Sequence, residues 1–499
     1  MTERGRQQAT GWNRWCSILL RIILALAVAG TVLLIPDSTP PVLPPGEKQP
    51  FAWNQDQMWS SLEAQFARAR AAGCTHIAVR IDSTLAHLDT LLTTIADDAV
   101  APQDARLVQL EGTLFQLGPM VAACTERLPD YVNAFTRLRE IVKMQSRNWD
   151  MNSVAARQRV YRLLYGGRAA IEEVMLQAPP GTIPPLVLGC QEPSQTPSAE
   201  ILGVTIQSGD ILVSRGGAPT SALIARGNDY PGNFSHVALV QVDEQTHRVS
   251  IIESHIEKGV AIASIDDYLN DKKLRVMVLR LRADLPQLIA DPLLPHKAAT
   301  WMLEDARARH IAYDFEMDYR DKAKIFCSEV ASAAYAKVGI MLWMGLSNIS
   351  SRGVRSWLAA FGVRHFETQE PSDLEYDPQL RVVAEWRDPE TLWKDHLDNA
   401  VIDAMLEGAD SLETLRYSWY LLPVARVMKA YSAVLNLFGG IGPIPEGMNA
   451  TAALRNKEFS RRHDAIKARL LALAGEFRKQ NGYTPPYWAL VRLAREAKE

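Results

Sequence analysis

The hydrophobic and polar positions of the chain follow a helical period, then a strand period, and then a helical period again. Between residues 50 and 178, apolar side chains recur at three- and four-residue spacing, as at Leu85, Leu88 and Leu92. This spacing is typical of amphipathic helices, and we expect an antiparallel helical bundle there. Residues 391–499 return to the same spacing, which predicts a second helical region.

A linker and an α+β domain are expected between the two helical regions. Residues 179–199 are rich in Pro, Gly, Ser and Thr, a composition typical of linkers. From 200 to 390 the apolar runs become short and predict strands, at 210–213, 237–242, 249–253 and 275–281. Helices are expected at 295–310 and 327–337. The predicted fold class is therefore α+β, flanked by helical regions.

The N-terminus carries the longest apolar stretch. Residues 15–35 contain a single charge, Arg21, and the preceding residues 1–14 carry three arginines. About 20 apolar residues span a bilayer as a helix, and basic residues before the span hold that end in the cytoplasm. We therefore expect a single-pass anchor in a bacterial inner membrane, with the remaining chain outside. A cleaved signal peptide, with secretion, is the alternative, and a buried core helix is a third.

Composition excludes some classes of function. The net charge of -3, from 54 basic and 57 acidic residues that are scattered, gives no footprint for nucleic acid. No His, Cys, Asp or Glu cluster has metal-ligand spacing and no Gly-rich phosphate loop is present, so we expect no metal and no cofactor. Cys74 and Cys124 lie in helical sequence, which favours two buried thiols over a disulfide, although export would permit a bridge.

A predicted hairpin brings a histidine and a glutamate together. Residues 234–242 form its first strand, 243–247 its turn and 248–253 its return strand. A turn centred near Gln245 would place His236 opposite Glu253, where the carboxylate can orient the imidazole and stabilise its charge. A slip of one residue would send the two side chains to opposite faces. His255 shares the face of Glu253 and is a rival partner.

Cys327 lies at the start of the predicted helix 327–337. The backbone N–H groups and the positive dipole end at that place favour a thiolate, and the same N–H groups could bind an oxyanion. If His236 lies beside the helix start, the pair forms a thiolate–imidazolium dyad with Glu253 as the third member. Taken singly, Cys327 also suits a buried apolar role, His236 a strand histidine, and Glu253 a solvated carboxylate.

Five short stretches resemble the YiiX-like permuted papain-like amidases, relatives of the NlpC/P60 peptidases and of lecithin–retinol acyltransferase. They are 208–212, 234–239, 251–254 with 259–260, 312–315, and 326–330, with weaker likeness at 370–373 and 382–385. The resemblance implies a circularly permuted papain-like domain of the NlpC/P60 type. In this family the histidine precedes the cysteine along the chain, as His236 precedes Cys327 here.

The resemblance also implies roles for particular residues. Cys327 would be the nucleophile, His236 the general base and Glu253 the orienting acid, while Tyr313 would line the substrate site and Ser235 would tune His236. A core tyrosine and an ordinary strand residue are the alternatives for the last two. The implied activity is hydrolysis of an envelope amide, in a peptidoglycan peptide or a lipid, through an acyl-enzyme. A lipid acyltransferase or esterase of the same superfamily, or an inactive envelope scaffold, are the other interpretations.

Overall fold

The computed structural model describes residues 17–499 except positions 19, 23, 25–27, 29, 40, 43–46 and 54. Residues 1–14, and part of the stretch 15–35 for which we expect a membrane anchor, lie outside the described residues. Within the described part of the chain, none of the helices combines the length and the hydropathy that a membrane crossing requires. The expected mixture of helix and sheet is confirmed.

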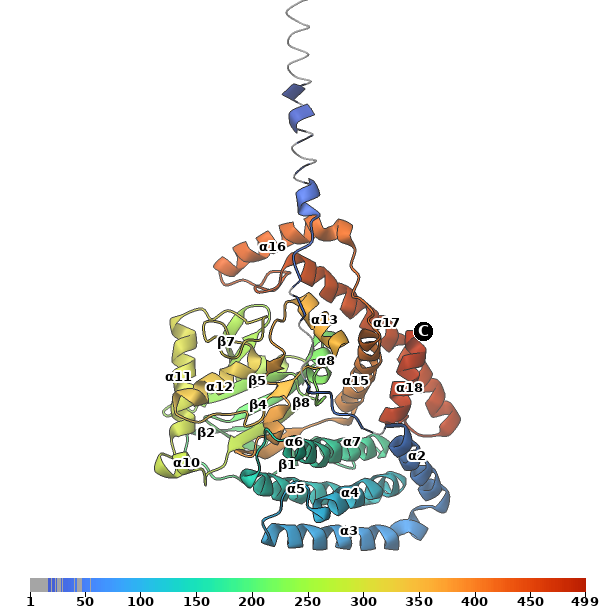
Figure 1. Cartoon of the computed structure of the whole chain (residues 1–499). Coiled ribbons are helices and arrows are strands. Elements are labelled where there is room, and N and C mark those ends of the chain that lie inside the picture. The colour runs from blue at the N-terminus through green and yellow to red at the C-terminus, as the bar shows by residue number, and fades with distance from the viewer. Residues whose placement is uncertain are drawn as a thin grey trace, which may run out of the picture.

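A helical bundle occupies one end of the molecule, with α3 as its outermost helix (Figure 1). Its helices are α2 (Gln55–Ala72), α3 (Cys74–Asp97), α4 (Ala105–Ala123), α5 (Leu128–Gln145), α6 (Val154–Tyr161) and α7 (Gly167–Gln177). A π-helical turn, Arg162–Gly166, joins the last two helices. Leu88 and Leu92, whose spacing predicts a helix, are buried in the core of this bundle.

A disulfide links two helices of the bundle. Cys74 opens α3, Cys124 caps the C-terminus of α4, and their sulfurs are bonded. The expectation of two thiols is therefore wrong, because the packing of α3 on α4 brings the two Cα atoms to 4.9 Å, a separation that suits a bridge. Cys190 and Cys327 are free among the described residues.

This bridge should contribute measurably to stability. It joins residues 50 positions apart, so Cys124→Ser is expected to lower the free energy of unfolding by about 2–4 kcal/mol, chiefly through the larger entropy of the open unfolded chain. Urea denaturation monitored by circular dichroism measures the difference. Cys190→Ser, at a free cysteine, is the matched control. Equal midpoints and slopes for the two variants would contradict a stabilising bridge.

A seven-stranded antiparallel sheet forms the centre, in the order β1-β11-β8-β4-β5-β6-β7. The strands are β1 (Leu186–Leu188), β4 (Ile211–Gly216), β5 (His236–Val242), β6 (Val249–His255), β7 (Gly259–Ser264), β8 (Lys273–Leu281) and β11 (Leu380–Trp386). β4, β5, β6 and β8 coincide with the expected runs. β1 lies in the stretch that we expect to be a linker, where it pairs with β11 at the edge of the sheet.

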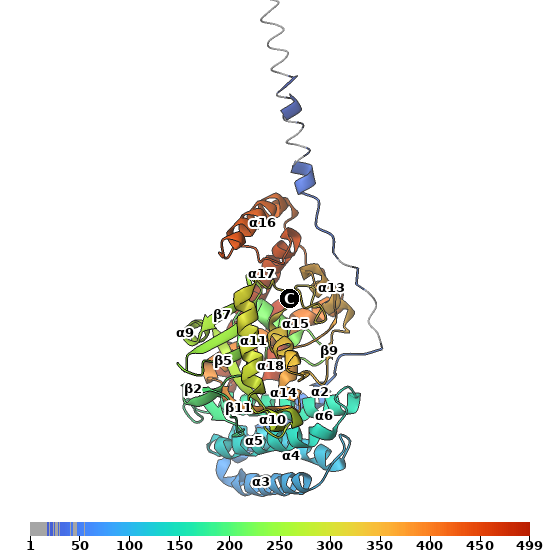
Figure 2. The same cartoon turned by 90° about the vertical axis from the view of Figure 1, so that its left-hand side faces the viewer.

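The two faces of the sheet are covered differently. Helices α11 (Leu294–Ala308) and α12 (Cys327–Lys337) pack on one face, against apolar side chains that include Val237 and Leu239 of β5 (Figure 2). The other face, with Ala238 and Val240, meets the hairpin of β2 (Ser198–Ile201) and β3 (Val204–Gln207), and Tyr268 of α9 (Ile265–Asn270). This division follows the alternation of side chains along a strand.

The C-terminal helices lie across the molecule from α11 (Figure 1). They are α15 (Pro389–Asp410), α16 (Leu422–Leu437), α17 (Ala450–Asn481) and α18 (Tyr487–Lys498). Together with α8 (Pro219–Arg226) and α13 (Arg352–Phe361), helices α15, α17 and α18 share an apolar core. α16 instead packs by a narrow face on the start of α17, at the end of the molecule opposite to α3 (Figure 1).

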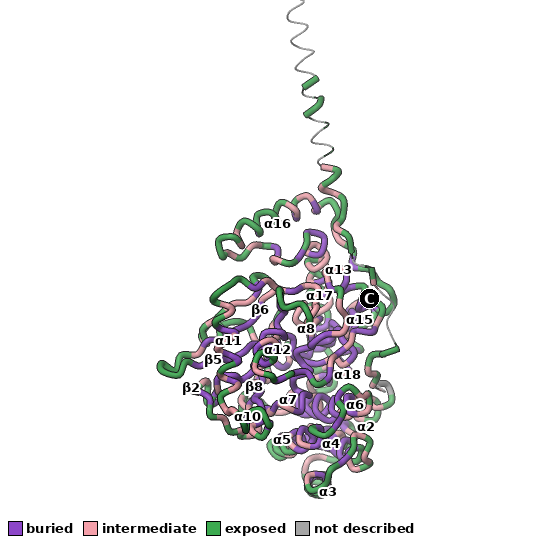
Figure 3. Tube along the Cα trace, turned by 60° about the vertical axis from the view of Figure 1, so that its left-hand side comes forward, coloured by how far each residue is buried: buried purple, intermediate pink, exposed green. Residues whose placement is uncertain are grey.

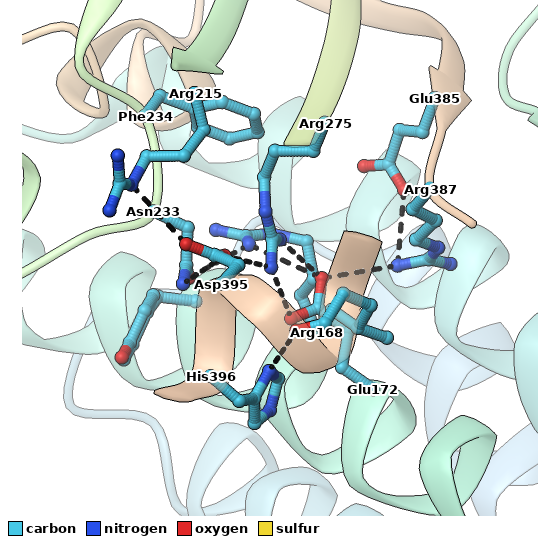
Figure 4. Close-up of polar contacts among 12 residues, drawn as sticks. Arg168, Glu172, Arg215, Asn233, Phe234, Arg275, Glu385, Arg387, Asp395 and His396 are labelled. Carbon is cyan, nitrogen blue, oxygen red and sulfur yellow. Dashed lines mark hydrogen bonds and ion pairs between the residues drawn. The ribbon is translucent and has the colours of Figure 1, made fainter. Parts of the chain in front are cut away.

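A buried network of charges joins the bundle, the sheet and α15 (Figure 4). Arg275 of β8 lies 2.6 Å from Glu172 of α7 and 2.5 Å from Asp395 of α15. Arg168, on the same helix as Glu172, pairs with Glu375 at 2.7 Å. Burial alone would raise the pKa of Glu172, but Arg275 and Arg168 outweigh it and lower that pKa to about 2. The carboxylate is therefore charged in the interior, and the three parts are held by ionic contacts as well as apolar packing.

Candidate active site

The centre of the site is an imidazole bound by a buried carboxylate. His236 begins β5, and its Nε2 lies 2.7 Å from Oε2 of Glu253 on the neighbouring strand β6. The side chain of Glu253 is 4% exposed and that of His236 is 20% exposed. The imidazole thus reaches solvent while the carboxylate does not, and the bond at Nε2 leaves Nδ1 as the nitrogen for another partner.

The register of the hairpin differs from the expected one by two residues. Glu253 pairs with Ala238, and not with His236, so the two residues of the contact are diagonal neighbours. The turn at 243–247 is centred one position later than expected. Because the shift is even, Glu253 keeps the same face of the sheet as His236, and their contact survives the error.

His255 occupies the second oxygen of the same carboxylate. Its Nε2 lies 3.0 Å from Oε1 of Glu253, and its ring is stacked on that of His236 with centroids 5.7 Å apart. Burial would raise the pKa of Glu253, but the hydrogen bonds from His236 and His255 outweigh it and hold the pKa well below its ordinary value. The residue that the sequence offers as a rival of His236 is therefore a second partner of a permanently charged Glu253.

Cys327 is the first residue of α12, as the sequence predicts. Its Sγ lies 3.8 Å from the carbonyl oxygen of Ser235, and the backbone N–H groups of Val237 and Ser328 also act on it. The thiol therefore contacts the backbone on both sides of His236. Glu329, in the first turn of α12, accepts a hydrogen bond from the N–H of Phe326 at 3.1 Å, which fixes the start of the helix.

The imidazole and the thiol approach the strand from different sides. Val237 points to the face that α12 covers, so alternation assigns the side chain of His236 to the opposite face, together with Ala238. The paired residues of β5 and β6 begin only at Ala238, which leaves the first residues of β5 without a neighbour on that edge.

The resting thiol is neutral. Burial is the largest influence and raises the pKa of Cys327 to about 12, although the N–H groups of Val237 and Ser328 lower it. The helix start does lower the thiol pKa, as we expect from the sequence, but burial raises the pKa by more. Deprotonation of this sulfur near neutral pH would need a base, since its position at the helix start does not ionise it.

The two residues expected to contact substrate have different surroundings. Tyr313 is half-buried, and burial, with a smaller contribution from the charge of Cys327, raises the pKa of its phenol well above the ordinary value. The hydroxyl of Ser235 is hydrogen-bonded to that of Ser221, while its carbonyl oxygen accepts from Cys327. Tyr313 thus lies close enough to the thiol to respond to its charge, and Ser235 contacts the thiol through its backbone.

A glycine fixes the segment that carries Tyr313. Gly259 has φ +72°, and a Cβ added there would come within 2.1 Å of the carbonyl oxygen of Ile311. Its neighbour Val260 donates to that same oxygen at 2.9 Å. The close approach requires a residue without a side chain, and it ties the strand after Glu253 to the loop beside the thiol.

A buried carboxyl group outside the expected site also affects Cys327. Glu370 is 3% exposed, its Oε2 has no hydrogen-bond partner among the described residues, and its charge would raise the pKa of Cys327. Burial raises the pKa of Glu370 well above its ordinary value, which favours the neutral form of this carboxyl. In the sequence, the only sign of a role for Glu370 is the weak resemblance of residues 370–373 to the permuted papain-like amidases.

The charge network holds the segment that leads into His236. The centroid of the Phe234 ring lies 5.1 Å from the guanidinium carbon of Arg168 and 6.0 Å from that of Arg275, and all three residues are drawn in Figure 4. The N–H of Phe234 donates to Ser372 at 3.0 Å, and the Asn233 amide oxygen accepts from Arg168 at 3.0 Å. These contacts set the position of β5 where the imidazole begins. No sequence period identifies them.

The site offers no set of metal ligands. Within the described part of the chain, the one group with metal-ligand geometry is Cys74, Cys124 and Glu126, far from the site, and its two sulfurs are bonded to each other. The polar groups next to the Cys327 sulfur are the carbonyl oxygen of Ser235 and the backbone N–H groups of Val237 and Ser328.

One of three comparisons with known proteins gives a match. Neither the search of curated proteins nor the search of solved structures gave a match. A family model does match, over residues 205–384, which hold His236, Glu253, Tyr313 and Cys327. That model describes the permuted papain-like amidase enzymes YaeF/YiiX of the C92 peptidase family, and residues 205–384 of this chain are similar to it.

Proposed function

We propose that the protein is a cysteine amidase that cleaves an amide bond of the cell envelope through a covalent acyl-enzyme. Cys327 is the nucleophile, His236 the general base and Glu253 the residue that orients the imidazole. One observation carries this proposal: the thiol at the start of α12 contacts the backbone on either side of an imidazole that a buried carboxylate holds at 2.7 Å. The family match supports the class of reaction.

The proposed cycle begins with a proton transfer. Nδ1 of His236 takes the thiol proton as Sγ of Cys327 attacks the amide carbon, and the charge that forms on the carbonyl oxygen meets N–H groups at the start of α12. The imidazolium is stabilised by Glu253, which stays ionised. It then gives the proton to the leaving amine as the C–N bond breaks. Water, deprotonated by the same imidazole, hydrolyses the thioester, releasing a carboxylic acid and restoring the thiol.

The proposed location is the outer side of a bacterial inner membrane. The basic residues before the apolar stretch 15–35 support that orientation. The Cys74–Cys124 disulfide supports it independently, because structural disulfides persist in oxidising compartments and are rare in the cytoplasm.

A panel of substrates tests this proposal. The protein is incubated separately with muropeptides, with N-acylated peptides and with phospholipids, and the products and the Cys327 peptide are followed by mass spectrometry. A new amine and carboxylic acid from an amide, with a transient acyl mass on Cys327, is the expected result. If only phospholipid acyl groups are cleaved or transferred, the protein is an esterase or acyltransferase and not an amidase. If none of the three is modified, the amidase proposal fails in favour of a scaffold.

A further inference from the structure

The outward side of α16 is apolar over its whole length. Its exposed apolar residues follow helical spacing, and the flanking segments extend the same surface: Val424, Val427, Met428, Tyr431, Val434 and Leu437 on the helix, with Trp419, Tyr420, Phe438 and Ile441 beside it. Leu437 and Phe438 are 82% and 84% exposed. We call these ten residues the α16 face. In Figure 3, α16 is drawn largely in the colour of exposed residues.

The inner side of α16 is already used for packing. Leu422 and Ala425 are buried against Ile444, Met448 and Ala450. Lys429 donates to the carbonyl oxygen of Pro445 at 2.8 Å, which closes the loop that returns to α17. The helix is therefore held in place from within. Exposed apolar surface of this size on a soluble protein marks an interaction site.

The charge of this segment has one sign. From residue 417 to residue 445 there is no Asp or Glu, and the charged residues are Arg426 and Lys429. An amphipathic helix with basic charges and exposed aromatic residues is typical of segments that lie in the interface of an anionic bilayer. Because the segment carries no Asp or Glu, none of its own side chains repels anionic lipid headgroups.

The apolar N-terminal stretch meets α16 directly. Arg426 donates to the carbonyl oxygen of Val32 at 2.9 Å and also to that of Ile35. Asp37 continues the contact, because its carboxylate accepts from the N–H of Thr451 at 3.1 Å. Beyond these contacts the described residues of the stretch lead away from the body at the end of the molecule where α16 lies (Figures 1 and 2). The α16 face and the N-terminal apolar stretch therefore adjoin, and both are apolar surfaces that would be stable in a bilayer.

We propose that the α16 face docks on an anionic lipid bilayer and lies in its interface beside the N-terminal stretch. Trp419, Tyr431 and Phe438 would sit at headgroup depth. The α16 face and the N-terminal apolar stretch would enter the bilayer together. Because they adjoin, the chain would have one orientation relative to the membrane. This proposal stands whatever reaction the protein performs.

Docking would bring the active-site loop close to the bilayer. Phe315 packs with Leu422 and Met448 in the core beneath α16, and His310 contacts Glu446 at 3.0 Å. Both residues belong to the loop that carries Tyr313. The surface that holds α16 in place is therefore shared with the segment beside Cys327.

Fluorescence of the full-length chain in vesicles tests the proposal. Val434→Cys, on the α16 face, is labelled with an environment-sensitive nitrobenzoxadiazole probe and mixed with vesicles of phosphatidylethanolamine and phosphatidylglycerol. Val79→Cys is the matched control, because Val79 is 78% exposed on α3 at the far end of the molecule. The parent chain without the added cysteine is labelled in parallel and its signal is subtracted.

The expected result is a blue shift of the Val434 probe on addition of vesicles, and loss of most of its emission to shallow doxyl-labelled lipids. The Val79 probe should show neither change. Val427→Glu, placed beside the probe, should restore emission without altering the circular dichroism spectrum. A Val434 probe that behaves like the Val79 probe would overturn the proposal. So would a blue shift that depends on protein concentration without lipid, because it would mean that a second copy covers the face.

Discussion

Replacement of Cys327 by alanine is expected to lower the turnover of an amide substrate by about 10³-fold or more, because the covalent route disappears with the sulfur. Cys327→Ser is expected to lose nearly as much, since a hydroxyl in the same buried position is a weaker acid than the thiol. Turnover is measured from product formation under saturating substrate. Residual activity within about tenfold of the parent would contradict a nucleophilic role for this residue.

The comparison needs a folded protein and a neutral reference. Cys327 is 5% exposed at the start of α12, so the unfolding transition of each variant is recorded first. Cys190→Ser is the reference for activity, because Cys190 is the other free cysteine of the described residues. The turnover of Cys190→Ser is expected to equal that of the parent protein. A comparable loss there would show that removal of any thiol disturbs the enzyme.

Glu172→Gln is expected to destabilise the fold by about 3–5 kcal/mol, the second large effect that the structure predicts. Glu172 is 1% exposed and contacts Arg275 at 2.6 Å, Arg168 at 3.5 Å and Arg387 at 3.7 Å (Figure 4). An amide of the same shape would leave these buried guanidinium groups with less compensating charge. Chemical denaturation at neutral pH gives the difference in free energy of unfolding.

The effect of this substitution should depend on pH with a definite sign. The pKa of Glu172 is lowered to about 2 in the folded chain, below about 4.3 for an unperturbed glutamate. Its contribution is therefore complete above the unfolded value and is lost as the pH falls toward the folded value. The parent and Glu172→Gln should differ most at neutral pH and converge in acid. A difference that is constant with pH would contradict the ionic origin.

A surface substitution provides the matched control for this prediction. Glu407 pairs with Arg495 at 2.6 Å, and both side chains are more than 40% exposed. Exposed ion pairs contribute about 0–1 kcal/mol, so Glu407→Gln should change the free energy of unfolding little. A loss as large as that of Glu172→Gln would mean that burial of the network does not set its importance.

The parts of the site that follow local patterns could be predicted from the sequence. Cys327 opens α12 because a polar loop gives way there to a run of small and apolar residues, a local change of pattern. Glu253 reaches His236 because side chains alternate along a strand, a rule that tolerates an error of two in the register. The helices and the central strands follow from the same periodicities.

The parts that depend on contacts distant in sequence could not be predicted. β1 is only three residues long, too short to show an alternation of apolar and polar residues. It is nevertheless a strand because it pairs with β11, nearly 200 positions later in the chain. The thiol pKa depends on burial by many segments, which outweighs the helix start that the sequence does reveal. Arg168, Arg275 and Asp395 come from three regions and look like ordinary charged residues until the fold unites them.

The rate of alkylation of Cys327 as a function of pH, in the parent and in His236→Ala, tests the central claim most directly. Iodoacetamide is used, peptide mapping counts the adducts, and Cys190 serves as the internal reference. Burial places the pKa of the isolated thiol at about 12, so reaction at neutral pH requires a base. We predict that the parent reacts at neutral pH, whereas the variant reacts only in alkali. Superimposable profiles would contradict the partnership of Cys327 and His236.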